Sequence, residues 1–407
     1  MIDNNQKNNQ IRRIMLAGGG TGGSVLPLLA VAEELLKTEV VAGERALKTG
    51  SATDALPGQK RLEIVFVGTT RGPEKEMVAD FNSRIGNMKF IPLSGGKWRR
   101  YFSWQNFFDV FKIIIAFFKS FRILRRERPE IIISAGSFIA VPLVWAAALK
   151  KIPILVHQQD IRPGLANKLM APFARVITVA FEKSLADYGP RAVLTGNPVA
   201  SAVEQQGREQ GGQIRDWYGL SPDQPLILVI GGSTGASALN KLVAAAAPEL
   251  SRFCQIVHIT GKGKTIENDA GGEGQVENVG TENNAYHVFE FLNYDNLLVL
   301  LASADLVVSR CGLGALTELS ALEKPAILIP MPRTHQEDNA AVFAAADAAV
   351  VLNQDELTPE KLTTAIKKIL EDPGLRSALS RNIGKVIKRG AAASIAGIVW
   401  EIVGDKI

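Results

Sequence analysis

Two segments of the chain share one pattern of apolar and glycine residues. Each begins with a short apolar run, at residues 14–17 and 226–230, that predicts a buried strand. A glycine-rich turn follows in each, and then an apolar-periodic run at residues 25–36 or 236–250 that predicts a helix. The same strand, glycine turn and helix therefore occur in both halves of the chain.

Further short apolar runs alternate with helical stretches after each copy. The expected strands are Glu63–Val67, Glu130–Ser134, Pro153–His157 and Val176–Val179 in the first half, and Gln255–Ile259, Asp305–Ser309 and Pro325–Pro330 in the second. Such alternation is typical of parallel sheets that are covered by helices on both faces. The predicted fold class is α/β, with two Rossmann-like, doubly wound parallel-sheet domains facing a cleft.

The boundary between these domains is expected after Gly196-Asn197-Pro198, because the residues that follow are polar and contain a pair of glycines. The N-terminal domain is then residues 1–198 and the C-terminal domain residues 199–384. A helix at about 385–407 is a candidate to pack back on the first domain. Residues 39–61 show little periodicity and are expected to form a loop.

The composition limits the classes of protein to which the chain can belong, but it does not identify a function. A length of 407 residues suits two domains, and 46% apolar with 21% charged residues excludes a disordered chain or a coiled coil. The two cysteines, Cys254 and Cys311, have no metal-ligand spacing and suit a reducing compartment. The polar start lacks a signal-peptide pattern, and no apolar run is long enough to span a bilayer. We therefore expect a soluble or peripheral protein.

The glycine turns suggest phosphate binding. Turns at the carboxyl ends of parallel strands present backbone N–H groups at a helix N-terminus, although a glycine turn can also serve only close packing. Gly18, Gly20 and Gly23 fit G-x-G-x-x-G, but the expected second strand ends in Val67-Gly68-Thr69-Thr70, without the acidic residue that binds a dinucleotide ribose. No P-loop is present. A phosphate loop in each half therefore favours a nucleotide-sugar enzyme.

Six motifs carry a more specific resemblance. They are Gly19-Gly20-Thr21-Gly22-Gly23, His157-Gln158-Gln159-Asp160 with Gly164-Leu165-Ala166-Asn167-Lys168, Gly196-Asn197-Pro198-Val199, Gly232-Ser233-Thr234-Gly235-Ala236, Gly314-Ala315-Leu316-Thr317-Glu318-Leu319, and His335-Gln336 with Asn339-Ala340. In this order, over roughly residues 12–352, they resemble the family 28 glycosyltransferases that add N-acetylglucosamine to lipid I in peptidoglycan synthesis. The resemblance implies the two-domain GT-B fold.

The same resemblance implies that the second domain binds UDP-N-acetylglucosamine. The implied donor residues are Ser233, Thr234 and Gly235 at the diphosphate, Leu292 at uracil, Arg310, Leu313, Gly314, Ala315, Leu316 and Thr317 near the phosphates, Glu318 at the ribose, and Gln336 and Asn339 at the sugar hydroxyls. No cofactor is implied, and the absence of an Asp-x-Asp motif argues against an obligatory metal ion.

In the first domain, the resemblance assigns Thr21, Gly22, Gly23, Ser24 and Asn167 to the lipid acceptor. An inverting transfer needs a base for the acceptor hydroxyl, and the candidates are Asp160 and His157, either of which can instead be structural.

Four positions depart from the family pattern. Ser24 replaces a family histidine that is a candidate base, and Ala200 replaces an arginine that is a candidate phosphate ligand. Gln158 and Asp160 replace a glutamate and an asparagine. Arg310 is a candidate to compensate for Ala200.

Charge and aromatic residues gather in one segment. The chain has a net charge of +5, yet residues 84–128 contain eleven basic and two acidic residues, a net charge of +9. The loop residues Trp98, Arg99, Arg100, Tyr101 and Phe102 suit an anionic membrane surface. In the helix expected from Trp104 onward, we predict that Phe107, Phe111, Ile114 and Phe118 pack against the sheet. Nucleic acid is not an expected partner, because no recognised binding motif accompanies the charge.

The resemblance therefore implies inverting transfer of N-acetylglucosamine to the 4-hydroxyl of undecaprenyl-pyrophosphoryl-N-acetylmuramoyl-peptide, a polyprenyl-diphosphate lipid. The enzyme would act at the cytoplasmic face of the membrane as a peripheral protein. Two alternatives stay open: a UDP-sugar-binding relative that has lost catalysis, and a GT-B enzyme with another lipid acceptor or another reaction.

Overall fold

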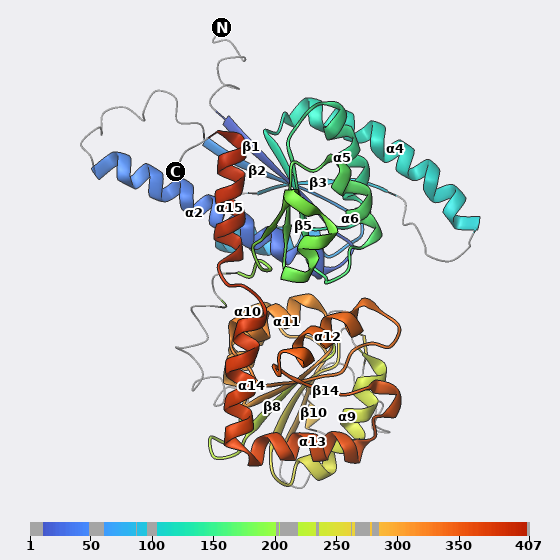
Figure 1. The fold of residues 1–407 in the computed structure, drawn as a ribbon, viewed down its shortest axis with the longest axis vertical. Helices are drawn as coiled ribbons and strands as arrows, with labels where there is room; N and C mark the ends of the chain where they lie inside the picture. Colours follow the sequence, from blue (N-terminus) through green and yellow to red (C-terminus); the bar gives the residue numbers. More distant parts are fainter. Residues whose placement is uncertain are drawn as a thin grey trace. The chain divides into compact units, whose positions relative to one another are not determined.

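A computed structural model gives the fold (Figure 1). It describes residues 11–48, 61–86, 88–95, 104–200, 203, 219–232, 236–261, 263–264, 277–278 and 285–404, with only the backbone described at 39–48, 104–110 and 277–278. The chain divides into two compact units, one of residues 1–200 with 388–407 and the other of residues 201–387. The boundary expected from the sequence, after Pro198, lies two residues before this division.

The first unit contains a seven-stranded parallel sheet in the order β3-β2-β1-β4-β5-β6-β7. Its strands are β1 Ile11–Ala17, β2 Arg61–Gly68, β3 Met88–Pro92, β4 Ile131–Ser134, β5 Ile154–Gln158, β6 Val176–Val179 and β7 Ala192–Leu194. Its helices are α2 Leu26–Lys48, α3 Glu74–Arg84, α4 Trp104–Glu127, α5 Ala140–Leu149, α6 Leu165–Met170 and α15 Ala391–Val403, with short 3-10 turns at Gly22–Ser24, Ala171–Phe173, Glu182–Asp187 and Gly189–Arg191.

Helices cover both faces of this sheet, as the alternating pattern predicts. One buried apolar cluster joins the sheet to α4, α5 and α6, and a second joins it to α2, α3 and α15. The central strands β4 and β5 are entirely buried because they lie between two helical layers, which is why their residues are mostly apolar.

The second unit contains another seven-stranded sheet, in the order β10-β11-β9-β8-β12-β13-β14. Its strands are β8 Leu226–Ile230, β9 Gln255–Ile259, β10 Glu277–Asn278, β11 Tyr286–Phe289, β12 Leu306–Ser309, β13 Ala326–Leu328 and β14 Val350–Val351, and β10 alone pairs antiparallel. Its helices are α9 Ser237–Leu250, α10 Tyr294–Ser303, α11 Leu313–Ala321, α12 His335–Ala345, α13 Pro359–Glu371 and α14 Pro373–Val386, with a 3-10 turn at Gln354–Glu356.

The end of the chain returns to the first unit. Helix α14 packs in the second unit, whereas α15 lies against α2 and contributes Ile395, Val399 and Trp400 to the first unit's core. The expected helix at about 385–407 thus begins later, at Ala391, after a left-handed Gly390.

The loop expected at residues 39–61 is corrected in part. Helix α2 continues through residue 48, because residues 39–48 are mostly good helix formers with one glycine, at position 43. Residues 49–60 lie outside the described part of the chain.

Helix α4 corrects a second expectation. The side chains of Phe111, Ile114 and Phe118 are exposed by 52%, 46% and 67%, so they do not pack against the sheet. The buried stripe consists of Ala116, Ser120, Ile123, Leu124 and Glu127. Because α4 has two apolar stripes at helical spacing, periodicity alone does not identify the one that faces the core. The side chain of Phe107 and the loop residues 98–102 lie outside the described residues.

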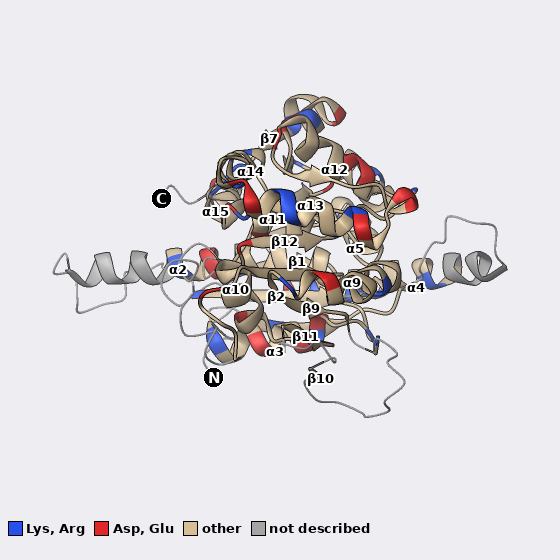
Figure 2. Cartoon of the chain, turned by 90° about the horizontal axis from the view of Figure 1, so that it is seen from below, with Lys and Arg blue, Asp and Glu red and all other residues tan. Residues whose placement is uncertain are grey.

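Helix α4 extends away from the rest of its unit (Figure 1), and Figure 2 marks Lys and Arg in blue along its described part. Five exposed basic residues lie along the part of α4 whose side chains are described: Lys112, Lys119, Arg122, Arg125 and Arg126. In the described part of the chain, no helix has the length and apolarity needed to cross a membrane.

Candidate functional site

The first unit's glycine loop, residues 18–24, connects β1 to α2 and is closed by Ser24. The Ser24 hydroxyl accepts from the Gly19 N–H over 3.1 Å and lies 3.2 Å from the Gly19 carbonyl, to which it can donate. The Gly20 N–H donates to Glu74 Oε1 over 3.1 Å. These contacts fix the loop and leave Thr21 and Gly23 exposed at the entry to α2.

This geometry places the predicted acceptor residues at a helix N-terminus. No side chain caps the 3-10 turn Gly22–Ser24 that precedes α2, so its first backbone N–H groups have no capping side chain as a partner. Ser24 occupies the position of the family histidine but serves the loop itself. A serine hydroxyl is not a base at neutral pH, so the proton acceptor has to lie elsewhere.

His157 lies at the carboxyl end of β5 and is 2% exposed. Its Nδ1 is 2.9 Å from Thr178 Oγ1, and its Nε2 is 2.9 Å from Asn197 Oδ1. Burial lowers the pKa of His157 to about 4, against the two hydrogen bonds, which raise it. With both ring nitrogens engaged and almost no exposed surface to meet a substrate, His157 has the geometry of a structural residue rather than of a base.

The residues after β5 form a network around Gln158. Its amide donates to the carbonyls of Asp160 and Arg162, over 2.6 and 3.1 Å, and its Oε1 accepts from Asn167 Nδ2 over 2.6 Å and from the Tyr188 hydroxyl over 3.1 Å. Asn167 also donates to the His157 carbonyl. Gln158 and Asn167 are buried and therefore position the loop, whereas the Asp160 side chain is partly exposed.

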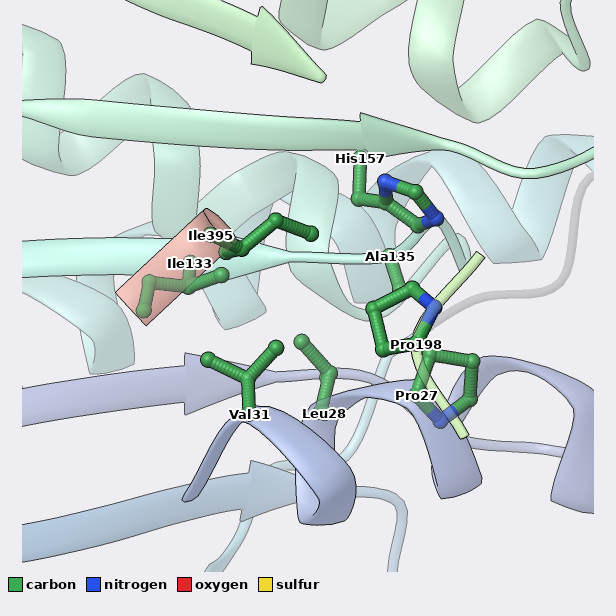
Figure 3. A pocket seen from close by; sticks show the side chains of 8 residues that line it. All are labelled: Pro27, Leu28, Val31, Ile133, Ala135, His157, Pro198 and Ile395. Atoms are coloured by element: carbon green, nitrogen blue, oxygen red, sulfur yellow. The ribbon is translucent and has the colours of Figure 1, made fainter. Parts of the chain in front are cut away.

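A pocket lies inside the first unit beside these residues, between α2, β4, β5 and α15 (Figure 3). It is lined by Pro27, Leu28, Val31, Ile133, Ala135, His157, Pro198 and Ile395. The lining is apolar except for the His157 ring, so the pocket lacks the polar groups that a diphosphate or a sugar requires. The candidate site is the polar loop edge rather than this pocket.

In the second unit, the candidate donor residues lie at the carboxyl ends of β8, β11 and β12. Ser233, Thr234 and Gly235 fall outside the described residues, directly after Gly232 at the end of β8. Leu292 is half-buried in the turn between β11 and α10, next to Phe291, which is 68% exposed.

Helix α11 begins behind β12 with Gly312 at its N-cap and no capping side chain. Its first N–H groups are therefore available to an anion, aided by the helix dipole. Gly314 and Ala315 are half-exposed there, whereas the side chains of Leu313, Leu316 and Thr317 are buried and can contribute only through the backbone. The predicted phosphate contacts are thus backbone contacts.

Glu318 lies in α11 and is 8% exposed. The Tyr294 hydroxyl, at the start of α10, donates to its Oε1 over 3.0 Å. Burial raises the pKa of Glu318 to about 7, although this hydrogen bond lowers it. A buried carboxylate beside an uncapped helix N-terminus can accept hydroxyl groups of a ligand whose phosphates lie on that helix.

Gln336 and Asn339 lie in α12, and both are hydrogen-bonded to the backbone of Cys311, which precedes α11. Gln336 Oε1 accepts from the N–H groups of Cys311 and Met331, over 3.3 and 3.0 Å, which directs its amide nitrogen to other partners. Asn339 Nδ2 donates to the Cys311 carbonyl over 3.1 Å and is fully buried. Asn339 therefore fixes the segment that precedes α11, and Gln336 is the one of the two that can reach a ligand directly.

Arg310 does not have the geometry expected of a phosphate ligand. It is 5% exposed, and its guanidinium donates to the carbonyls of Ile329 and Pro330 and to Gln354. These bonds link the end of β12 to the end of β13 and the 3-10 turn Gln354–Glu356. Arg310 is a structural cross-link, and these hydrogen bonds occupy the guanidinium that was expected to compensate for Ala200.

Two residues of these edges were missed by sequence reasoning, Glu74 and Tyr294. Glu74 begins the helix after Gly68, so an acid in the first helical turn was the available signal. Tyr294 carries no such signal, because its value lies in a contact with Glu318 across 24 residues of sequence. Within the described residues, no group of three or more His, Cys, Asp and Glu side chains is arranged to hold a metal ion.

The sequence matches the glycosyltransferase family 28 N-terminal domain over residues 14–179 and the family 28 C-terminal domain over residues 226–393. Two curated relatives carry the name UDP-N-acetylglucosamine–N-acetylmuramyl-(pentapeptide) pyrophosphoryl-undecaprenol N-acetylglucosamine transferase. The Clostridium kluyveri protein is 35% identical over 366 residues, 88% of this chain and 91% of the relative. The Geobacillus thermodenitrificans protein is 33% identical over 366 residues, 89% of this chain and 91% of the relative.

Solved structures support the fold. Acinetobacter baumannii MurG gives a TM-score of 0.64 at 22% identity and covers 96% of this chain and 99% of its own. The UDP co-structure of S. aureus MnaA gives 0.65 at 14% identity, covering 98% and 99%. The glycosyltransferase of kitacinnamycin gives 0.66 at 15% identity, covering 97% and 99%. The two-domain GT-B fold predicted from the motifs is thus confirmed.

Both halves of the chain match in order, and the curated relatives cover about nine-tenths of it. The chain therefore belongs to glycosyltransferase family 28.

Proposed function

We propose that this protein transfers N-acetylglucosamine, with inversion, from UDP-N-acetylglucosamine to the 4-hydroxyl of the N-acetylmuramoyl residue of lipid I. The observation that carries the proposal is the match to relatives named for this reaction, at 33 to 35% identity over nearly the whole chain. The product would be lipid II. The rest of the proposal assigns roles to the residues of the two loop edges.

The donor would lie on the second unit. The first N–H groups of α11 and the turn after β8 would hold the diphosphate, Leu292 would meet uracil through its backbone, and Glu318 would accept the ribose hydroxyls. The Gln336 amide would contact the sugar. Because these groups already stabilise two phosphates, UDP can leave with its charge held by N–H donors, and we propose no obligatory metal ion or cofactor.

The acceptor would lie on the first unit, with its diphosphate at Thr21, Gly22 and Gly23. We assign the base to Asp160, since His157 is saturated with hydrogen bonds and buried. The Asp160 carboxylate would take the proton of the acceptor hydroxyl as that oxygen attacks the anomeric carbon and the bond to UDP breaks. Gln158 would position Asp160 through its carbonyl.

We further propose that the first unit binds the membrane surface that carries the lipid. The exposed apolar stripe of α4, residues Phe111, Ile114, Ile115 and Phe118, lies among exposed lysines and arginines. In the sequence, residues 98–102 just before α4 are aromatic and basic as well. Each basic residue near an anionic leaflet contributes about 1 kcal/mol. The protein would then act as a peripheral protein on the cytoplasmic face.

The test is UDP release by the purified protein with UDP-N-acetylglucosamine and a lipid I analogue. We expect release that depends on the acceptor, with one sugar transferred for each UDP. Binding of UDP-N-acetylglucosamine without acceptor-dependent release would contradict the proposal and support a relative that has lost catalysis. Turnover with a different lipid would show that the acceptor is wrong.

A further inference from the structure

Glu74, the first residue of α3, is fully buried directly under the first unit's glycine loop. Its Oε1 accepts from two backbone N–H groups, from Thr69 over 2.7 Å and from Gly20 over 3.1 Å. Thr69 follows β2 and Gly20 follows β1. One carboxylate oxygen therefore ties together the loops that follow two adjacent strands.

Three glycines leave room for this carboxyl group. A Cβ atom added at Gly19 would lie 2.0 Å from Glu74 Oε1, one at Gly68 would lie 2.5 Å from Glu74 Cγ, and one at Gly72 would lie 1.9 Å from Glu74 Oε2. Real Cβ contacts are essentially never under 3.0 Å. Part of the glycine pattern therefore accommodates Glu74 rather than a phosphate.

The other carboxylate oxygen, Oε2, is buried and has no hydrogen-bond partner among the described residues. A buried oxygen without a partner destabilises a fold, so stability alone does not explain a glutamate at this position. The hydrogen bonds of Glu74 to the loop offer a reason for it. The Gly20 N–H that Glu74 Oε1 holds directly precedes Thr21, Gly22 and Gly23 at the entry to α2, of which Thr21 and Gly23 are exposed.

We propose that Glu74 is a positioning residue for the acceptor: by holding Gly20 and Thr69, it sets the loop so that the N–H groups of residues 21–23 face the acceptor diphosphate. This inference rests on the proposed function for the identity of the acceptor. Glu74 itself does not touch the substrate, because it has no exposed surface.

The first experiment compares E74A and E74Q in steady-state kinetics with the lipid I analogue. E74A removes both hydrogen bonds, and we expect the acceptor KM to rise about tenfold or more while the donor KM stays within about twofold. E74Q keeps a carbonyl oxygen for both N–H groups and should restore the acceptor KM to within about threefold of wild type. Equal changes in both KM values, or no change in either, would overturn the inference.

The matched control is E76A. Glu76 lies in the same first turn of α3 but is exposed. Both glutamates interact with the same helix dipole, so the control separates that effect from the contact with the loop. We expect E76A to behave as wild type, and an E76A effect as large as that of E74A would contradict the role of the loop contact.

A second variant tests the same contact from the other side. G72A places a methyl group against Glu74 Oε2 and should raise the acceptor KM by itself. In the E74A background the contact with Glu74 is removed and only the Thr69 hydroxyl, 2.5 Å from the added Cβ, still opposes the methyl group. G72A should therefore add less than it does in wild type, and the two effects should not be additive. Additive effects would show that Gly72 does not serve Glu74. If E74A does not fold, G72A alone still tests the inference, and an unchanged acceptor KM in G72A would overturn it.

Hydrogen exchange gives a readout that needs no substrate. The peptide that contains residues 18–24 should exchange faster than in wild type in E74A, but not in E74Q. Peptides of the second unit should exchange at the wild-type rate in both variants. If wild type does not use lipid I, the proposed function fails, but unchanged exchange at residues 18–24 in E74A would still overturn the positioning role.

Discussion

Each sheet has a buried ionisable group near the carboxyl ends of its strands, and the two groups differ in their hydrogen bonding. In the first unit, His157 has both ring nitrogens hydrogen-bonded and a pKa lowered to about 4. In the second unit, Glu318 receives one recorded hydrogen bond from the described residues, that of Tyr294, and has a pKa raised to about 7. Burial disfavours the charged form in both cases. Their hydrogen bonding differs: His157 is saturated, whereas Glu318 has capacity left for a ligand.

This difference separates structural groups from binding groups better than residue type does. A histidine near a strand end is the more familiar catalytic residue, yet its partners here occupy it completely. The first edge offers Asp160 instead, held by Gln158 through its backbone. Four expected outcomes test this comparison, beginning with the largest effect.

The largest effect is expected at Asp160. D160N should lower kcat by about 10²- to 10⁴-fold, because the amide does not take up the acceptor's proton, while the affinity for UDP-N-acetylglucosamine stays unchanged. Steady-state kinetics and calorimetric titration measure the two quantities. D187N removes an exposed carboxylate of the same unit and is the control. H157Q should keep kcat within a few-fold, and a loss at His157 as large as at Asp160 would reverse the comparison.

Glu318 should give the next largest effect, on the other substrate. E318Q removes the charge that accepts the ribose hydroxyls and should weaken UDP-N-acetylglucosamine binding by about 30- to 100-fold, the equivalent of about 2 to 3 kcal/mol. The acceptor KM should not change. An E318Q protein with wild-type donor affinity would show that Glu318, like His157, is structural. E323Q changes an exposed carboxylate two residues beyond α11 and is the control.

A moderate effect is expected at the exposed apolar stripe of α4, which we propose binds the membrane surface. I114S with F118S removes two exposed apolar side chains and should weaken binding to anionic liposomes by about tenfold or more. Sedimentation with liposomes measures this, and the donor affinity should stay constant. L149S, which changes an apolar side chain that is 69% exposed at the end of α5, is the matched control. Equal losses in both proteins would indicate general hydrophobicity rather than a membrane-binding face.

The smallest effect is a pH dependence of donor binding. Below the raised pKa of about 7, Glu318 holds a proton, and the neutral acid accepts fewer hydroxyl hydrogen bonds than the carboxylate. Affinity for UDP-N-acetylglucosamine should therefore rise with pH through about 7 and level off above it, with about tenfold weaker binding at about pH 6 than at about pH 8. E318Q should show a flat profile. A wild-type profile that is also flat would contradict the role of ionised Glu318.

Much of the fold followed from the apolar pattern. The strands at Val176–Val179, Leu226–Ile230 and Gln255–Ile259 were predicted with the observed bounds, because they lie inside the sheets and are mostly apolar. The missed strands lie nearer the sheet edges. β3 mixes Lys89 and Pro92 with apolar residues, and β14 has only two residues, so neither gives a clear strand pattern.

The site was predictable where a motif names the residue and less so where contacts decide its role. Glu318 and Gln336 lie at the edge where the motifs placed them. The sequence does not reveal that the Arg310 guanidinium donates hydrogen bonds to the carbonyls of Ile329 and Pro330. Nor does it reveal that Glu74 lies under the glycine loop. Such roles depend on contacts between residues far apart in the chain.

The central claim is that Glu318, whose carboxylate can accept further hydrogen bonds, accepts one from a hydroxyl group of the donor ribose. The direct measurement is a cycle of binding titrations in which UDP-N-acetylglucosamine and its 2′-deoxyuridine analogue are each bound by wild type and by E318Q. If Glu318 accepts the 2′-hydroxyl, wild type should lose about tenfold in affinity with the deoxy analogue, and E318Q should bind the two ligands almost equally. Equal losses in both proteins would place the ribose contact on another residue and contradict the account.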